Sequence, residues 1–388
     1  MAIPPTRAAA LKHLAAFAPR MGRDYAQGRN TDPGPGKRRD VSELSPHIRH
    51  RLISEEEVVR AALAHHTPQA AEKFIQEVFW RSYWKGYLEL RPAMWADYRA
   101  RARTEHARLQ GNAALAQAMQ GQTGIACFDA WARELAETGY LHNHARMWFA
   151  SIWIFTLRLP WVLGADFFLQ HLLDADAASN TLSWRWVAGI QTSGKHYLAR
   201  AENIARYTQG RFDPRGELNE AAAPLDEPGP PPAGALPPGA PPPRGRVALL
   251  LHDDDVGFWP EGCEVAAVAG LCFPAERSMA GAASPATAFT QAALADGLHR
   301  AGERAGVAPQ QVALEDIAEW AQGLPVVMPW TPVGWTAEML AGQPGSRRAW
   351  DSICWPLARA GFFPFKARIP AILGALSPDA SDLPLFAT

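Results

Sequence analysis

The sequence predicts a mainly α-helical protein with a small α/β region in its C-terminal part. In the N-terminal part apolar residues recur with the period of an amphipathic helix, and the segments concerned are 55–65, 69–90, 125–138, 143–158 and 164–175. Residues 223–245 are rich in proline and glycine without any period, which predicts an extended, semi-stiff linker. Beyond it, short apolar runs alternate with helical patterns, which favours a small α/β layer. The predicted division of the chain is 1–212, 213–245 and 246–388.

Local signals support each element. Ser54 precedes the run EEEVV, and a serine that accepts a backbone N–H favours a helix start. The runs RVALLLH at 246–252 and EVAAVAGLCF at 264–273 predict buried strands, because they are apolar and bounded by turn residues. The remaining predicted elements are amphipathic helices at 285–306 and 313–322, a strand at 324–330, and a helical close rich in Trp and Phe at 346–373.

The composition excludes several classes of protein. The formal net charge of the 388 residues is −1, so no overall positive charge predicts nucleic-acid binding, although a local basic patch stays open. The N-terminal segment lacks the apolar core of a secretory signal, and the apolar run Met147–Leu157 is too short to span a bilayer. We therefore expect a cytoplasmic protein without membrane contact.

The cysteines show no metal-binding or redox spacing. They are read as scattered structural residues of a reduced cytosolic protein, with a four-thiolate iron–sulfur site as the alternative, and they are Cys127, Cys263, Cys272 and Cys354.

The run HDDD, residues 252–255, follows the first predicted strand. We interpret it as a solvated turn, and a metal site is the alternative. This part of the chain contains neither GxGxxG nor GxxxxGK[ST], so no phosphate-binding loop is predicted.

Two carboxylates interrupt an apolar stretch in HLLDADAASNTLSWRWVAG, residues 171–189. Burying Asp174 and Asp176 is unfavourable unless each has a partner. Asn143 and Arg146 share one helical face, and Arg146 is the predicted partner of Asp174. Asp176 is then predicted to face a ligand.

A second group lies on the predicted helix 69–90. Glu77 and Arg81 are four residues apart, as are Trp80 and Trp84 beside them. For this helix alone the interpretation is an ion pair next to core aromatic residues.

Taken together, these segments resemble a known family. EVFWRSYWKGYLE, TGYLHNHARMW and HLLDADAASNTLSWRW occur in the order typical of the flavin-binding helical domain of DNA photolyases and cryptochromes, and RDVSELSPHIRHRLIS resembles its phosphate-binding segment. The resemblance covers about residues 4–212. It implies a short photolyase-like protein without the α/β antenna domain that precedes this domain in full-length members.

The resemblance implies FAD in a helical pocket. Hydroxyl and backbone groups near the FAD phosphates and ribitol would be those of Tyr25, Ser42, Leu44 and Ser45. The pocket wall would include Phe74, Glu77 and Arg81. Around the isoalloxazine ring the resemblance places Tyr140, Asn143, Arg146, Asp174, Asp176 and Asn180. Asn180 occupies the position that faces flavin N5, and an Asn there resembles the photolyases.

The resemblance also implies a catalytic set. Trp80 and Trp186 match the aromatic walls that sandwich a pyrimidine dimer flipped out of DNA, with Glu77, Asn143 and Met147 around it.

Two further tryptophans match an electron-transfer chain. Trp184 and Trp161 stand at its proximal and middle positions. The third member is expected near Arg108, where no Trp occurs, so Trp95 or Trp153 substitutes for it or photoreduction is impaired.

The chain departs from the family pattern at several positions. Val41 replaces a Thr of the phosphate-binding segment, and His144 replaces an Arg common in dimer-repairing members. Leu182 and Ser183 replace two glycines, and residues 189–210 replace the family's usual segment near the lesion-binding rim. These changes put DNA repair in more doubt than FAD binding.

Three functions stay open. The first is a deoxyribodipyrimidine photolyase-like lyase, in which reduced FAD absorbs blue light and gives an electron to a cyclobutane dimer in damaged DNA. The second is a cryptochrome-like photoreceptor whose C-terminal region binds a protein partner, and the third is a light-independent FAD protein. Repair predicts a basic rim around the flavin pocket, with Lys85, Arg91 and Lys195 as candidates.

Overall fold

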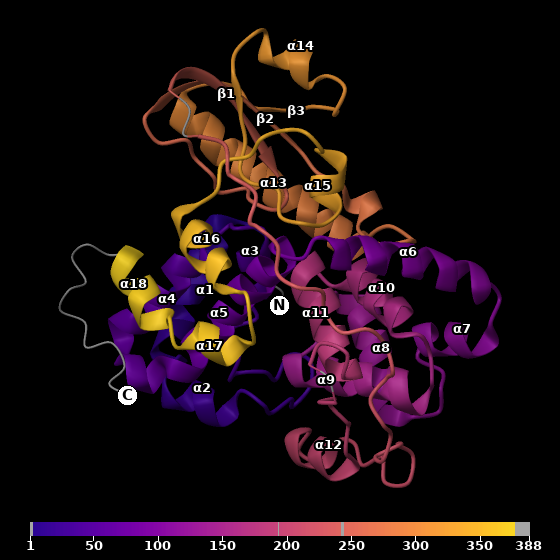
Figure 1. The fold of residues 1–388 in the computed structure, drawn as a ribbon. Helices are drawn as coiled ribbons and strands as arrows, with labels where there is room; N and C mark the ends of the chain where they lie inside the picture. The colour runs from indigo at the N-terminus through magenta and orange to yellow at the C-terminus, as the bar shows by residue number, and fades with distance from the viewer. Residues whose placement is uncertain (1–2, 193, 242–243, 377–388) are drawn as a thin grey trace.

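A helical part and a small parallel sheet make up the computed structural model, which describes residues 3–192, 194–241 and 244–376 (Figure 1). This confirms the predicted fold class. The N-terminal helices are α1 (Arg7–Phe17), α2 (Arg23–Gly28), α3 (Ser45–Arg49), α4 (Glu55–His65), α5 (Pro68–Glu89), α6 (Ala93–Arg108), α7 (Ala113–Gln120), α8 (Ala126–Thr138), α9 (Asn143–Ser151), α10 (Trp161–His171), α11 (Ala177–Ala188) and α12 (Ala201–Tyr207).

Local chemistry sets the ends of these helices. Ser54 accepts the N–H of Glu57, whose carboxylate accepts the N–H of Ser54, so α4 begins with a capping box. The predicted helix 143–158 is α9 followed by a π-helical turn, Ile152–Thr156. Neither this apolar segment nor any other helix in the described ranges is long and apolar enough to cross a membrane.

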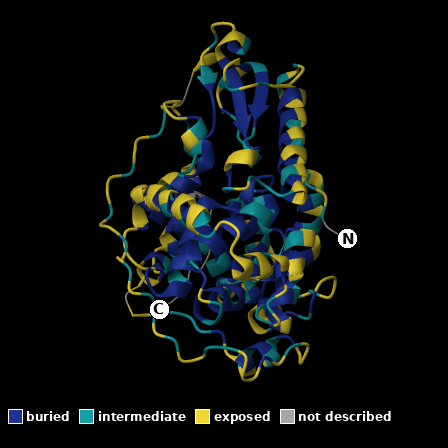
Figure 2. Ribbon diagram, turned by 90° about the vertical axis from the view of Figure 1, so that its right-hand side faces the viewer, coloured by how far each residue is buried: buried dark blue, intermediate teal, exposed yellow. Residues whose placement is uncertain are grey.

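The sheet lies on one side of the helical part, and its strands are parallel in the order β3-β2-β1-β4. Its elements are β1 (Gly245–His252), β2 (Cys263–Leu271), β3 (Gln310–Gln311), β4 (Val326–Val327), α13 (Ser284–Ala305), α14 (Ile317–Ala321) and α15 (Trp335–Met339). Figure 2 shows the central strands as buried. Alternate residues of β1 face opposite sides: Leu249 packs with α13, and Leu250 packs with Ile317 of α14. The predicted strands and helices of this region are thus present, with β4 and α14 shorter than expected.

The proline-rich segment lies along the helical part as an extended chain. Residues 223–241 form no helix or strand, and the segment ends where Gly245 begins β1. The Arg91 guanidinium donates to the carbonyl of Pro231 at 2.9 Å, and the N–H of Gly234 donates to the carbonyl of Leu90 at 2.8 Å. The segment is therefore bound to the end of α5.

The last helices return to the helical part. They are α16 (Ala349–Cys354), α17 (Phe362–Lys366) and α18 (Ile369–Leu376), and Figure 1 shows them beside α4 and α5, away from the sheet. Trp350 stacks on Phe79 of α5 with ring centroids 4.8 Å apart. A Cβ at Gly86 would lie 2.6 Å from the Cα of Trp355, so only glycine lets α5 and this segment approach so closely.

The predicted division of the chain into domains at residues 212 and 245 remains a proposal. Buried residues of the last helices, after residue 349, pack in the same hydrophobic core as the N-terminal helices. Residues 1–2, 193, 242–243 and 377–388 of the predicted segments lie outside the described residues.

The turn after β1 differs from the prediction. Asp253, Asp254 and Asp255 are at most 7% exposed, whereas a solvated turn was expected. Arg49 lies 2.8 Å from Asp254, and Asp255 accepts two bonds from Arg348, at 2.6 and 2.7 Å. Guanidinium groups thus neutralise the carboxylates. Among the described residues, no group of three or more His, Cys, Asp or Glu side chains is arranged to hold a metal ion.

Replacement of Asp255 by Ala is predicted to destabilise the fold by about 3–5 kcal/mol, because it removes the buried partner of Arg348 and Arg51. Urea unfolding followed by circular dichroism measures this difference. Asp213→Ala, which removes an exposed pair with Arg215, is the control and is expected to leave stability almost unchanged, because solvent screens this pair. An Asp255→Ala effect as small as that of the control would contradict the prediction.

The same pair predicts a pH dependence. Burial disfavours the charge of Asp255, but Arg348 and Arg51 outweigh this and lower its pKa from 3.8 to about 2. The stabilisation is therefore complete above pH 4 or so and is lost as the pH falls towards 2. We expect the difference between wild type and Asp255→Ala to narrow over this range.

Candidate functional site

A cavity of about 650 Å³ lies among α2, α5, α9 and α11, which is the size of a small-molecule or cofactor site. Segments far apart in the sequence contribute its walls. The predicted site residues that line it are Tyr25, Ser42, Ser45, Phe74, Glu77, Trp80, Arg81, Tyr140, Asn143, Arg146, Met147, Asp174, Asp176, Asn180, Trp184 and Trp186.

Two predicted residues do not line this cavity. The Leu44 side chain is fully buried in the helical core, and its N–H donates to the hydroxyl of Ser42. Trp161 lies behind the wall in α10, against Tyr98. Any contact of Leu44 with a ligand would therefore have to use its backbone.

The predicted pair of Arg146 and Asp174 is confirmed. Arg146 Nη2 lies 3.0 Å from Asp174 Oδ2, and Arg146 Nε donates to the carbonyl of Leu141 at 2.8 Å. Burial raises the pKa of Asp174, but the Arg146 charge outweighs it, so that the pKa lies below its ordinary value. The carboxylate is thus charged and fixes the chain before α11 against α9.

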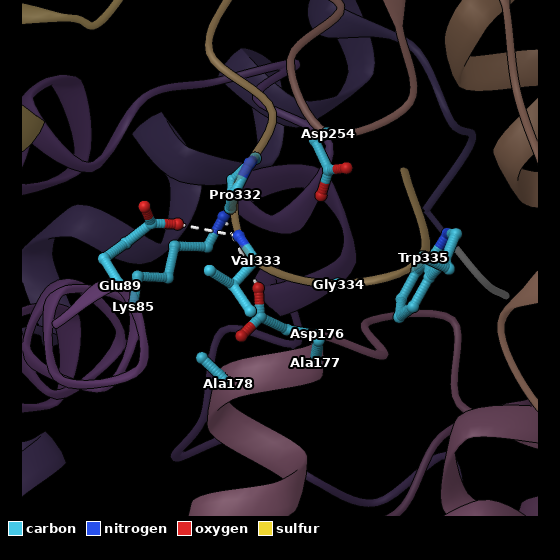
Figure 3. A pocket seen from close by; sticks show the side chains of 10 residues that line it. All are labelled: Lys85, Glu89, Asp176, Ala177, Ala178, Asp254, Pro332, Val333, Gly334 and Trp335. Atoms are coloured by element: carbon cyan, nitrogen blue, oxygen red, sulfur yellow. Dashed lines mark hydrogen bonds and ion pairs between the residues drawn. The ribbon is translucent and has the colours of Figure 1, made fainter. Parts of the chain in front are cut away.

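The sequence analysis predicted that Asp176 faces a ligand. Asp176 lines the cavity, but both of its carboxylate oxygens have protein partners. Its Oδ1 accepts the N–H of Ser179 at 2.8 Å and caps α11, and its Oδ2 lies 3.4 Å from Lys85 Nζ. Figure 3 shows Lys85 and Asp176 beside Asp254 and Glu89 in a small polar space that borders the cavity wall. Despite burial, Lys85 and Arg49 hold the pKa of Asp176 well below its ordinary value.

The expected ion pair between Glu77 and Arg81 is absent from the described contacts, because both side chains bind elsewhere. Glu77 pairs with Arg29, which follows α2. Arg81 donates to the backbone carbonyl of Ser45 at 3.3 Å, and its Nη1 is buried without a protein partner. Glu77 therefore reaches the cavity as one half of an ion pair.

The two predicted aromatic walls are each covered by another ring of this chain. Phe362 of α17 stacks on Trp80 with centroids 3.6 Å apart and an interplanar angle of 11°. Tyr197, from the segment that departs from the family pattern, lies 5.8 Å from Trp186 at 26°. One face of each tryptophan is thus in contact with protein.

Asn180 and Trp184 are placed by α10. The Asn180 amide donates to the carbonyl of Ala165 at 2.8 Å. The Trp184 ring packs against Gly164, where any Cβ would collide with it, and lies 6.3 Å from Trp153 in an edge-on contact.

The predicted basic rim is only partly present. Lys85 and Arg91 are 3% and 6% exposed, and both are engaged in protein contacts. Lys195 is exposed. Two of the three expected cations therefore cannot meet a DNA backbone.

Several lining residues were missed by the sequence analysis. Arg29 lies one helical turn after Tyr25, and Trp84 one turn after Trp80, so the spacing was a usable signal. Glu43 lines the cavity with a left-handed backbone, φ 53°, which no sequence pattern indicates.

Comparison with known proteins gives a match over this site. Residues 74–221 match the family model of the FAD binding domain of DNA photolyase. The deoxyribodipyrimidine photo-lyase of Streptomyces griseus is 37% identical over 197 residues, covering 50% of this chain and 40% of that enzyme. The Escherichia coli enzyme is 31% identical over 217 residues, or 54% and 44%. Cryptochrome-1 of Arabidopsis thaliana is 38% identical over 98 residues, or 25% and 14%.

The chain thus spans less than half the length of the two photo-lyases. Among solved structures, a bacterial class III photolyase from Agrobacterium tumefaciens is similar with a TM-score of 0.43 and 25% identity, over 53% of this chain and 43% of that one.

The residues present fit an FAD molecule. The cavity offers hydroxyls of Ser42 and Ser45 and the guanidinium of Arg81 for anionic groups. Its buried atoms without a protein partner include a donor, Arg81 Nη1, and an acceptor, Asp174 Oδ1. Unsatisfied buried polar atoms at a cavity wall are expected where a polar ligand binds.

Replacement of Asp174 by Ala is predicted to weaken FAD binding about tenfold or more, because it releases Arg146 from the cavity wall and removes a charged hydrogen bond worth about 1.5–3 kcal/mol. Titration of the FAD-free protein with FAD, followed by flavin fluorescence, measures the affinity. Glu105→Ala removes an exposed pair with Arg108 and should leave it unchanged. Equal affinities for the two variants would contradict this role of Asp174.

Proposed function

Because this chain belongs to the DNA photolyase and cryptochrome family through its FAD-binding domain, we propose that it is a photolyase-like enzyme driven by blue light. FAD is its cofactor. When bound and reduced, FAD supplies the photoexcited electron that splits a cyclobutane pyrimidine dimer and is then returned. The single observation that carries the proposal is that the predicted FAD-contacting residues other than Leu44 and the predicted dimer-contacting residues line one cavity.

The chain's own residues would hold and orient the two ligands. Arg146 and Asp174 would fix the wall beside the flavin ring, and the bond of Asn180 to Ala165 would hold the amide in place at that wall. Hydroxyls of Tyr25, Ser42 and Ser45 would contact the rest of FAD.

The dimer would enter the remaining part of the cavity. Trp80 and Trp186 offer ring faces, and Glu77 and Asn143 offer polar groups for base edges, with Met147 beside them. An extruded base needs flat walls and a few edge hydrogen bonds, which this arrangement supplies.

Damaged DNA is the proposed partner, in line with the names of the photo-lyases that this chain resembles. We also propose a cytoplasmic location, because Cys127 and Cys354 are buried free thiols of the kind found in reducing compartments.

A specific observation favours a second candidate, a cryptochrome-like photoreceptor without repair activity. Phe362 covers one face of Trp80, and Tyr197 covers one face of Trp186. Lys85 and Arg91 are buried, so they give no basic rim. In this reading the C-terminal region binds a protein partner.

Illumination of dimer-containing DNA decides between the two. The protein is loaded with FAD, reduced, and exposed to blue light with single- and double-stranded oligonucleotides that carry one dimer. Repair predicts loss of the dimer in light and not in darkness. Intact dimers with spectroscopically confirmed reduced FAD would overturn the photolyase proposal and leave the photoreceptor.

Replacement of Phe362 by Ala is predicted to strengthen binding of dimer-containing DNA about three- to tenfold, because a stacked pair worth about 0.5–1.5 kcal/mol no longer covers Trp80. Fluorescence anisotropy of a labelled oligonucleotide measures it. Phe363→Ala is a matched control, since Phe363 is 78% exposed and makes no described contact with Trp80. Equal binding by wild type and Phe362→Ala would show that this ring does not compete with DNA.

A further inference from the structure

We propose that Tyr98 is the terminal electron donor of this protein, oxidised by Trp161 with transfer of its phenol proton to Asp166. The proposal rests on the proposed function, because it concerns the residues that supply electrons to the photoexcited cofactor. It fills the third position of the chain, where the sequence offers no Trp near Arg108.

The first two members stand on α10 and α11, two helices that pack on each other. Trp184 lines the cavity and packs against Gly164. Trp161 lies three residues before Gly164 in the same helix, hence one turn away on the same face. Both indoles are 2% exposed, so water does not quench a charge that passes between them.

Tyr98 is the ring beside Trp161. It belongs to α6, which Figure 1 shows alongside α10, and its ring centroid lies 6.0 Å from that of Trp161 with an interplanar angle of 33°. The ring is fully buried. Trp95 lies beyond it at 5.2 Å, with its indole N–H donating to Glu338 at 2.8 Å.

The carboxylate of Asp166 is in position to accept the phenol proton of Tyr98. The Tyr98 hydroxyl donates to Asp166 Oδ1 at 3.4 Å, and Asp166 Oδ2 lies 2.9 Å from Nε2 of His106. The His106 side chain is 31% exposed, so this route ends at solvent. Burial and the charge of Asp166 raise the pKa of Tyr98 well above its ordinary value, so the phenol holds its proton until it is oxidised.

The step balances in electrons and protons. Bound FAD in its oxidised form would supply the electron acceptor for this chain. On illumination Trp184 would give up one electron and Trp161 would refill it. One electron then passes from Tyr98 to the Trp161 radical cation, the O–H bond of Tyr98 breaks, and its proton binds the carboxylate of Asp166. The products are neutral Trp161, a neutral tyrosyl radical and a protonated carboxyl group.

The charges around the two rings favour this direction. The guanidinium carbons of Arg101 and Arg185 lie 5.5 and 5.9 Å from the Trp161 ring centroid, against one carboxylate, Glu227, at its indole N–H. A positive charge on Trp161 is therefore disfavoured. Oxidised Tyr98 carries no charge once Asp166 holds its proton, although Arg99 is nearby.

Electron paramagnetic resonance of the illuminated, FAD-loaded full chain tests the proposal. Protein with ring-deuterated tyrosine is compared with protein that carries ordinary tyrosine, so that a tyrosyl radical is recognised by its altered hyperfine pattern. We expect a tyrosyl signal in wild type and in Trp95→Phe, and its loss in Tyr98→Phe. Asp166→Asn, which keeps the shape of the side chain but is a poorer base, should slow the appearance of the radical, and heavy water should slow it in wild type.

A second measurement does not need FAD. Azide radicals generated by pulse radiolysis oxidise tryptophan in the FAD-free protein, and the later transfer to tyrosine is followed by absorption. Tyr98→Phe should lose the part of this transfer that is slowed in heavy water.

The outcomes separate the two claims. No light-induced radical in any variant, with bound FAD confirmed, would overturn the electron-transfer chain and with it the role of Tyr98, whereas failure of the proposed light-driven function would show separately as intact dimers in the assay with reduced FAD. A radical that stays on tryptophan in wild type, or one that disappears in Trp95→Phe and persists in Tyr98→Phe, would overturn the role of Tyr98 alone.

Discussion

Ion pairing of buried aspartates is the constraint on which this structure depends. Asp176, at the start of α11, and Asp254, in the turn after β1, border the same small polar space. Lys85 and Arg49 supply the positive charge they need, and Arg49 also donates to the carbonyl of Ala175. Removing any one of these four charges would leave another buried without a partner in the protein interior, which solvates charges poorly. Lys85 and Arg49 therefore join the cavity wall to the α/β region.

Much of the helical part was predictable because its signals are local. Capping by Ser54 and the pairing of Arg146 with Asp174 follow from spacing and from the need to neutralise a buried charge. The partners that spacing did not reveal are distant in sequence. Glu77 binds Arg29 instead of Arg81, and Asp255 binds Arg348, because tertiary packing brings these groups closer than one helical turn does.

The aromatic residues show the same limit. The resemblance placed Trp80 and Trp186 at the cavity, and both line it. It gave no account of Phe362, which lies beyond the matched residues 74–221, or of Tyr197, which stands in the segment 189–210 that departs from the family pattern. The rings that cover these two tryptophans could therefore be found only in the structure.

The return of the C-terminal helices has a consequence for how the chain acquires its fold. The Tyr83 hydroxyl donates to the carbonyl of Ala360, 277 positions later. Contacts of such long sequence separation close late and slow folding. During synthesis, the α5 surface that receives Trp350 and Trp355 stays exposed until these two residues have left the ribosome. This apolar surface of α5 is therefore exposed, and open to aggregation, while the strands of the sheet are being synthesised.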